Sequence, residues 1–210
     1  MLLTVKIDGK DNSGSAVAVT RNRALTALHG HVKLNHEIAL RTRNGTILKG
    51  KIEFVRFTRD VVDIAVILLD DGSFFEHYIP WSDEPVYLTQ PILVVGLRYS
   101  HGTDMVMPYA RTINVDMIKD GGSTLFQATY YKFNGCSGTG VVTSLRDGVC
   151  EVVGVHIASH DDSSLESPKK KKKIMNELEA SVSSKIHGDS AYSLVCEIAR
   201  VPELIAHLNS

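Results

Sequence analysis

Short runs of alternating apolar and polar residues cover most of the chain, and this pattern is typical of β-strands rather than helices. The run Leu3–Ile7 alternates, whereas Ala16–Val19 is apolar throughout, as in a strand buried on both faces. The turn pair Asn44–Gly45 separates two apolar runs and predicts a tight hairpin. In the first 72 residues the pattern predicts six strands: Leu3–Ile7, Ala16–Val19, Ala24–Leu28, Glu37–Thr42, Thr46–Phe57 and Ile64–Leu69.

The pattern changes at residues 73–85, where polar and turn residues are frequent and the only tryptophan, Trp81, is found. We expect this stretch to connect two halves of the molecule. Residues 201–208 have apolar positions on one helical face behind Pro202, so they are expected to form a terminal helix. Between the connection and this helix the pattern predicts six further strands: Pro91–Leu97, Met105–Val115, Leu125–Tyr130, Gly140–Leu145, Val149–Ala158 and Ala191–Ile198.

Together these elements predict an all-β protein of two six-stranded antiparallel β-barrels with a short C-terminal helix. The expected boundaries are residues 1–72 for the N-terminal barrel, 73–85 for the inter-barrel connection and 86–210 for the C-terminal barrel. Within the second barrel, residues 160–187 form a polar insertion that includes five consecutive lysines, Lys169–Lys173. Like charges repel one another, so we expect a solvated loop; the alternative is a patch that contacts nucleic acid weakly and in a salt-dependent way.

The composition fits a soluble globular chain, since 43% of the 210 residues are hydrophobic and 22% are charged. A formal net charge of -1 predicts no general attraction to nucleic acid or to an anionic membrane. No apolar run approaches the roughly 20 residues of a membrane helix, and residues 1–8 do not resemble a signal peptide. The three cysteines are too widely spread for a disulfide framework, so we expect a reducing, cytoplasmic location.

Three residues of types that often act in catalysis follow one another along the chain in a characteristic order. His29 ends one apolar strand, Asp63 begins another, and Ser137 lies in the glycine-rich segment Gly135–Gly140. Histidine, then acid, then serine in a glycine-rich turn is one of the chain orders of a Ser-His-Asp triad. The order and the strand context together favour a catalytic interpretation over three unrelated structural residues.

The chemistry of acyl transfer requires these residue types. A serine hydroxyl is a weak nucleophile, so His29 would take the proton of Ser137 and return it to the leaving amine. Asp63 would fix the tautomer of that histidine and stabilise the imidazolium. The flanking glycines allow the backbone N–H groups of Gly135 and Ser137 to form an oxyanion hole, a contribution of about 3 kcal/mol per donor.

These motifs resemble those of the chymotrypsin-like (trypsin-fold) serine proteases, whose hallmarks are Thr-Ala-Ala-His, Asp-Ile-Ala-Leu and Gly-Asp-Ser-Gly-Gly segments. This chain has Thr-Ala-Leu-His ending at His29, Asp-Ile-Ala-Val beginning at Asp63, and Gly-Cys-Ser-Gly-Thr around Ser137. The resemblance spans roughly residues 13–208 and is specific only at the motifs. It implies two orthogonal barrels with the active site in the cleft between them, a polypeptide substrate, and neither cofactor nor metal ion.

One departure from the family pattern is Cys136, which stands where digestive members have an aspartate that pairs with a newly cut N-terminus. A cysteine cannot form that ion pair, so we expect no activation of that kind. With the absence of a disulfide framework, this moves the resemblance toward intracellular members, either high-temperature-requirement proteases or viral polyprotein-processing proteases.

A second resemblance concerns specificity, because the segment Gly154–Ala158 is similar to the Gly-x-His segment that lines the primary pocket of many viral members. It implies that His156 contacts the residue before the scissile bond and favours Gln or Glu there, with Lys132 as a positive partner for Glu. A substrate strand is expected to add along Ile157, Ala158 and Ser159. The alternative is that His156 is a partly buried strand histidine without such a role.

Two neighbouring residues compete for catalytic roles. Ser137 has a glycine two positions before it and another directly after it, as the motif requires, whereas Cys136 has neither. Asp60 competes with Asp63, but only Asp63 leads directly into an apolar strand. A zinc site would need a fourth ligand that the scattered cysteines do not predict, and its candidate ligands are His29, His31 and His36.

The sequence therefore predicts a serine endopeptidase that acts through an acyl-enzyme. The alternative from another class is a catalytically inactive protease-like domain that binds peptide, or RNA through Lys169–Lys173. The presence of all three triad residues favours the enzyme, because a binding module needs none of them. The sequence names neither the physiological substrate nor the oligomeric state.

Overall fold

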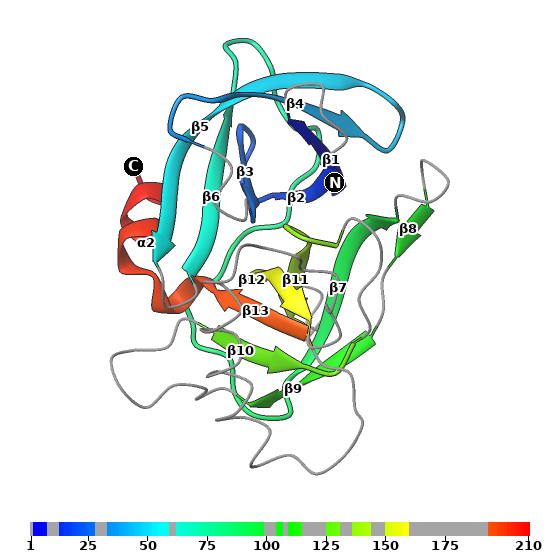
Figure 1. The fold of residues 1–210 in the computed structure, drawn as a ribbon, viewed down its shortest axis with the longest axis vertical. Helices are drawn as coiled ribbons and strands as arrows, with labels where there is room; N and C mark the ends of the chain where they lie inside the picture. The colour runs from blue at the N-terminus through cyan, green and yellow to red at the C-terminus, as the bar shows by residue number, and fades with distance from the viewer. Residues whose placement is uncertain are drawn as a thin grey trace, which may run out of the picture.

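The first barrel is closed by strands from the N-terminal third of the chain. We describe it from a computed structural model, in which the described residues are 2–7, 13–27, 33–58, 62–98, 104–106, 109–114, 125–130, 136–143, 150–159 and 193–210. Its strands follow the order β1-β2-β3-β6-β5-β4, with β4 returning to pair with β1, and Figure 1 shows them in blue to cyan. The bounds are β1 Leu2–Ile7, β2 Ser13–Ala18, β3 Arg23–Thr26, β4 Glu37–Thr42, β5 Ile47–Thr58 and β6 Val62–Leu69.

The predicted hairpin at Asn44–Gly45 is confirmed. Strands β4 and β5 pair antiparallel up to Arg41 and Ile47, and Gly45 lies between them with a φ of 87°. The backbone N–H of Gly45 donates to the carbonyl of Thr42 at 3.0 Å. Glycine adopts this left-handed conformation without the steric cost that a Cβ atom brings, and the turn therefore closes easily.

Apolar side chains that alternate along the strands fill the interior of the first barrel. In β4, buried Ile38 and Leu40 alternate with residues that are more exposed, so one face of the strand packs inward. Phe75, which follows β6, joins the same cluster. The buried members of the cluster are Ala16, Ala18, Ala24, Ile38, Leu40, Ile52, Ala65, Ile67, Leu69 and Phe75.

The second half of the chain forms a curled seven-stranded sheet in the order β11-β12-β13-β10-β9-β7-β8. Because β11 also pairs with β7, six of these strands follow one another in a ring, below the first barrel in Figure 1. The predicted class of two antiparallel barrels with a short terminal helix is confirmed. The bounds are β7 Pro91–Arg98, β8 Asp104–Val106, β9 Tyr109–Asn114, β10 Leu125–Ala128, β11 Gly140–Thr143, β12 Val152–Ser159 and β13 Ser193–Glu197.

Two of these strands, β8 and β9, lie where the sequence predicts the single strand Met105–Val115. Both pair antiparallel with the same strand, β7, in one register: Arg98 is opposite Asp104 and Pro91 is opposite Arg111. Residues 107 and 108, between them, lie outside the described residues. Strand β8 therefore extends the pairing of β9 along β7 and adds no new position to the ring.

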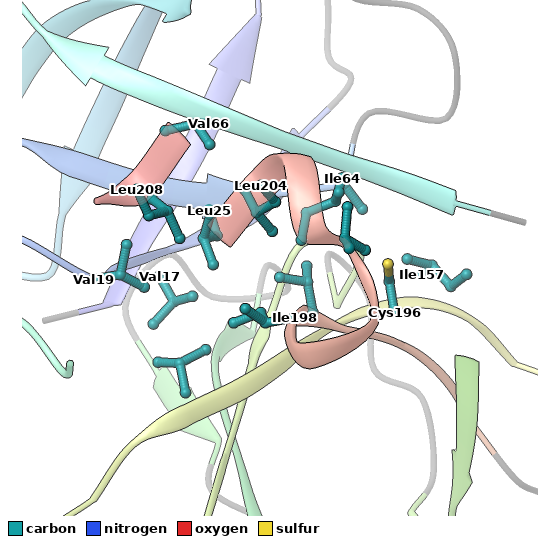
Figure 2. Close-up of a cluster of buried hydrophobic side chains, with 14 of the residues drawn as sticks. Val17, Val19, Leu25, Ile64, Val66, Ile157, Cys196, Ile198, Leu204 and Leu208 are labelled. Carbon is teal, nitrogen blue, oxygen red and sulfur yellow. The ribbon is translucent and has the colours of Figure 1, made fainter. Parts of the chain in front are cut away.

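Another apolar cluster joins the two barrels. Figure 2 shows Val17 and Leu25 of the first barrel facing Ile198 and Leu204, which follow the last strand of the second barrel. These last residues lie in the 3₁₀ helix η2 (Ile198–Arg200) and the helix α2 (Pro202–Leu208), as predicted for a terminal helix. The apolar surface buried in this cluster stabilises the relative position of the two barrels. Each Å² of buried apolar area contributes roughly 25 cal/mol to that stabilisation.

The residues between β6 and β7 contact both barrels. Ile79 donates its N–H to the carbonyl of Ala18 in β2 at 3.0 Å, and Trp81 forms a parallel bridge with Val152 in β12. Further along, the N–H of Val86 donates to Oε1 of the fully buried Glu197 at 2.8 Å. These bonds hold the chain against the junction of the barrels. Residues 160–187, with their five lysines, lie outside the described residues.

Among the described residues, no helix is long and apolar enough to cross a membrane.

Candidate active site

Ser137 lies in a tight turn that leads into β11. The N–H of Thr139 donates to the carbonyl of Cys136 at 2.9 Å, and Gly138 has a φ of 82°. Two further bonds tie the turn to β12: the N–H of Gly138 donates to the carbonyl of His156, and the N–H of His156 donates to the carbonyl of Thr139, each at 2.9 Å. The serine is half-buried on this rigid support, so its side chain starts from a fixed backbone.

The same turn is bonded to the first barrel. The N–H of Ser15 in β2 donates to the carbonyl of Ser137 at 2.7 Å, and the hydroxyl of Thr26 in β3 donates to the carbonyl of Ser15 at 2.8 Å. A Cβ atom on Gly138 would overlap that same carbonyl oxygen. A Cβ atom on Gly140 would stand 2.8 Å from the side chain of Val17. The glycines of this motif are therefore needed for the close approach of two barrels as well as for the turn.

Asp63 is the second residue of β6 and is buried, with 9% of its surface exposed. Strand β6 pairs with β3, where Ala65 is opposite Thr26. Asp63 thus lies two residues from the partner of Thr26, and Thr26 supports the Ser137 turn through Ser15. The structure brings the predicted acid and the predicted nucleophile to the same end of β3.

Three predicted site residues lie outside the described residues: His29, which follows the end of β3 by three residues, and Lys132 and Gly135, which precede the Ser137 turn. Their roles as base, pocket cation and oxyanion donor stay predictions.

His156 is buried, with 1% of its surface exposed, and both of its ring nitrogens have partners. Nδ1 lies 2.6 Å from the hydroxyl of Tyr130, and Nε2 lies 3.1 Å from Sγ of Cys136. The rings of Tyr130 and His156 are tilted, with centroids 5.4 Å apart. The hydroxyl of Ser193 donates to the backbone carbonyl of Tyr130 at 3.0 Å. A connected set of polar side chains therefore lies inside the second barrel. One member of this set, Cys136, directly precedes Ser137 in the sequence.

Burial raises the pKa of the Tyr130 phenol well above its usual value of 10.0, and the nearby Cys136 raises it further, while a hydrogen bond from Ser193 lowers it. The phenol is therefore neutral at physiological pH and has a proton to donate. If it donates to Nδ1, the neutral imidazole carries its own proton on Nε2, on the side of Cys136.

Comparison with known proteins places this geometry in context. No protein-family model and no curated protein sequence matches the chain. Among solved structures, it is similar to the protease Rv3671c of M. tuberculosis, at 13% sequence identity and a TM-score of 0.61 over 100% of this chain and 89% of that one. It is similar to the MamO protease domain of Magnetospirillum magneticum, at 16% identity and a TM-score of 0.62 over 100% and 96%. A serine protease of a human pathogenic astrovirus has 16% identity and a TM-score of 0.57 over 94% and 88%.

The chain has the chymotrypsin-like serine protease fold. The resemblance that the motifs predicted is confirmed at the level of architecture, although the identities are low. Within this protease fold, the roles of individual residues rest on the chain's own geometry.

The predicted substrate-binding strand lies beside the Ser137 turn of the protease fold. Strand β12 pairs with β11 up to Val155 and Gly140, and beyond His156 no described strand pairs with that edge. On its other edge β12 continues to Ser159, which is opposite Ser193 of β13. The side chain of Ile157 is buried in the apolar cluster between the barrels, so the predicted pairing with a peptide would involve its backbone alone. Backbone groups at an unpaired edge can accept an added strand.

Three residues of the site were not singled out from the sequence: Ser15, Thr26 and Tyr130. Thr26 belongs to the Thr-Ala-Leu-His motif, so its position carried a signal although its role did not. Tyr130 ends a predicted strand, and nothing in the local sequence indicates a partner 26 residues further along the chain. Such contacts depend on strand register, which alternation alone does not specify.

Proposed function

We propose that this chain is a serine endopeptidase. Ser137 attacks the peptide carbonyl, His29 takes the hydroxyl proton and passes it to the leaving amine, and Asp63 orients His29. Water then attacks the acyl-enzyme with the same histidine as base, which releases the carboxylic acid and regenerates the hydroxyl of Ser137. The backbone N–H groups of Gly135 and Ser137 stabilise the oxyanion.

One observation carries this proposal: the turn bearing Ser137 is hydrogen-bonded to β2 of the first barrel and to β12 of the second. Preorganised backbone donors are effective because they need no rearrangement as charge develops in the transition state. A peptide-binding module would have no need to fix this one turn from both sides. The buried carboxylate of Asp63 at the same end of β3 supports the same interpretation.

The decisive experiment is labelling with a fluorophosphonate probe, which reacts with activated serines. We expect the wild-type protein to be labelled, Ser137→Ala to lose labelling completely, and His29→Ala and Asp63→Asn to lose most of it. Ser73→Ala, a serine substitution in the inter-barrel connection, serves as a control that keeps the reactive serine. Labelling that persists in Ser137→Ala rules out this nucleophile, and a folded wild type without labelling favours the peptide-binding alternative.

For specificity, we propose that His156 recognises Gln or Glu before the scissile bond, with Lys132 favouring Glu, and that the peptide pairs with β12 at Ile157, Ala158 and Ser159. The position of His156 directly behind the Ser137 turn supports this assignment. Loss of a buried hydrogen bond costs about 1–3 kcal/mol, so His156→Ala is expected to lower kcat/KM for Gln substrates by roughly 10- to 100-fold. Cleavage profiles from a peptide library measure this preference, and an identical profile for wild type and His156→Ala refutes the role.

A further inference from the structure

We propose that Cys136 is a specificity-determining residue, whose sulfur holds Nε2 of His156 until the substrate side chain displaces it. This inference rests on the proposed function, in which His156 recognises Gln or Glu. It adds a residue to that recognition and predicts how the side chain at position 136 tunes it.

The first step is the contact itself. Sγ of Cys136 lies 3.1 Å from Nε2 of His156, and the thiol, like the imidazole, is almost fully buried. Cys136 forms no disulfide. A buried N–H group without an acceptor destabilises the folded protein. The neighbouring sulfur therefore stabilises this orientation of the His156 ring when no substrate is bound.

The second step concerns the direction of the proton. Tyr130 keeps its phenolic proton because burial holds its pKa well above the usual value. When the phenol donates to Nδ1, Nε2 of the neutral ring bears the proton and donates toward the sulfur. Sulfur is a weak acceptor, whereas the side-chain oxygen of Gln or Glu is a strong one. The exchange of sulfur for oxygen therefore favours the substrates that carry such an oxygen.

The third step is that the exchange can occur without moving the backbone. The carbonyl of Cys136 accepts a bond from Thr139, and the residues that follow are tied to the main chain of His156. The thiol has one rotatable bond, so a rotation about χ1 takes the sulfur away from Nε2 while these bonds stay in place. Because Cys136 directly precedes Ser137, recognition of the side chain takes place next to the nucleophile.

The strength of the acceptor at position 136 should therefore change KM more than kcat. In Cys136→Ser the hydroxyl competes better than sulfur, and we expect KM for a Gln substrate to rise about 10-fold with kcat changed less than twofold. In Cys136→Ala the sulfur no longer competes for Nε2, and we expect KM to fall about threefold. For a substrate with Leu before the scissile bond, which makes no such hydrogen bond, neither change should alter KM.

Matched controls are available at Cys150, a partly exposed thiol that donates to the backbone carbonyl of Thr143. Cys150→Ser and Cys150→Ala make the same chemical changes away from the site and should leave both substrates unaffected. Thermal unfolding of every variant is measured first. If one Cys136 variant fails to fold, the other still tests the prediction, because the two are expected to change KM in opposite directions.

A spectroscopic readout tests the contact without substrate. The imidazole ¹⁵N shifts of His156, assigned with a His156→Gln variant, should report a proton on Nε2 in the wild type. They should change in Cys136→Ala but not in Cys150→Ala. Unchanged shifts in Cys136→Ala overturn the inference, even if the enzyme prefers Gln or Glu.

The kinetic outcomes separate this inference from the proposed function. A Gln or Glu preference that depends on His156, together with an unchanged KM in both Cys136 variants, overturns the role of Cys136 and leaves the proposed function intact. A wild type that cleaves peptides without any such preference refutes the specificity of His156 and, with it, the role of Cys136. The proposed nucleophile would stand in both cases, since it is tested by labelling.

Discussion

The buried polar side chains around the Ser137 turn lie at different places along the strands of the two barrels. In the first barrel, Thr26 ends β3 and Asp63 is the second residue of β6, while Ser15, inside β2, bonds to the turn through its backbone N–H. In the second barrel, His156 behind the turn lies inside β12, whereas the buried Ser193 and Glu197 begin and end β13. A polar group at a strand end can reach a turn or a cleft, whereas one inside a strand depends on a partner within the protein.

This difference indicates that the two barrels contribute to the candidate site in different ways. The first barrel offers polar groups at the edge that faces the Ser137 turn, where Thr26 supports Ser15 and Ser15 bonds to that turn. The second barrel carries the turn itself and buries the Tyr130–His156 pair behind it. We infer that the first barrel positions the site and the second sets which side chain is recognised. Three substitutions test this comparison.

The largest effect is expected where the barrels meet. In Gly138→Ala the new methyl group would overlap the carbonyl of Ser15, and the residue would also keep an unfavourable φ of 82°. We expect a loss of roughly 2–5 kcal/mol in the free energy of unfolding and more than about 100-fold in fluorophosphonate labelling rate. Chemical denaturation and labelling kinetics measure the two effects.

Gly45→Ala is the matched control, because Gly45 has a similar φ of 87° but nothing within 4 Å of the position of a Cβ atom. It should cost only the conformational strain, about 1–2 kcal/mol, with labelling unchanged. Equal losses in the two variants would mean that the contact with Ser15 contributes nothing beyond the turn conformation.

A smaller effect is expected from Tyr130→Phe, which removes the partner of Nδ1 of His156. At neutral pH we expect the free energy of unfolding to fall by about 1–3 kcal/mol. Tyr87→Phe, at a half-exposed tyrosine, is the control and should cost much less. Circular dichroism melts at one pH compare the two variants.

The pH dependence of Tyr130→Phe follows from the raised pKa of the phenol. The unfolded chain ionises Tyr130 near its usual value of 10.0, while the folded protein keeps it neutral to higher pH. This stabilisation is therefore present in full below pH 10 and is lost as the pH rises above it toward the folded pKa. The stability difference between wild type and variant should shrink above pH 10; a constant difference up to strongly alkaline pH contradicts the assignment.

The smallest effect is expected at Gln127, which is fully buried in β10 although neither amide atom has a hydrogen-bond partner in the described structure. Replacing an unpartnered polar group by an apolar one of similar size removes a desolvation cost. Gln127→Met should therefore leave the free energy of unfolding unchanged or raise it by up to about 1 kcal/mol.

Thr112→Val provides the contrast, because the fully buried hydroxyl of Thr112 donates to the carbonyl of Tyr87 and accepts the N–H of Gln90. We expect this change to cost about 1–3 kcal/mol. If Gln127→Met is as destabilising as Thr112→Val, the amide of Gln127 has a partner in solution, and denaturant titrations will show it.

Most of the fold could be predicted from the sequence because the barrel strands whose burial is described have one face or both faces in an apolar core. Alternation in segments such as Glu37–Thr42 and the turn at Asn44–Gly45 are local properties, and β4 and its hairpin appear where they predict. The alternation predicts one strand where the structure has β8 and β9, because both lie along β7 in one register. Pro108, which stands between them in the sequence, is the residue that could have indicated the division.

The candidate site was predicted only in part. The motifs selected Asp63 and Ser137 as candidates, since an acid or a serine in an apolar or glycine-rich context is visible in the sequence itself. The glycines were interpreted as turn formers, and Gly138 does have a positive φ. Their second requirement, the approach of β2 to within bonding distance, involves Ser15, some 120 residues away in the chain, and no local pattern contains it.

By itself, then, the sequence determined the strands, the hairpin, the class of fold and the identity of the candidate catalytic groups, because these depend on residue type and on neighbours along the chain. Only the tertiary structure decided that Ser15 and Thr26 support the Ser137 turn, and that His156 lies between Tyr130 and Cys136. The physical reason is that barrel closure sets the register of distant strands. Register, in turn, decides which side chains share a buried space and must satisfy one another's hydrogen bonds.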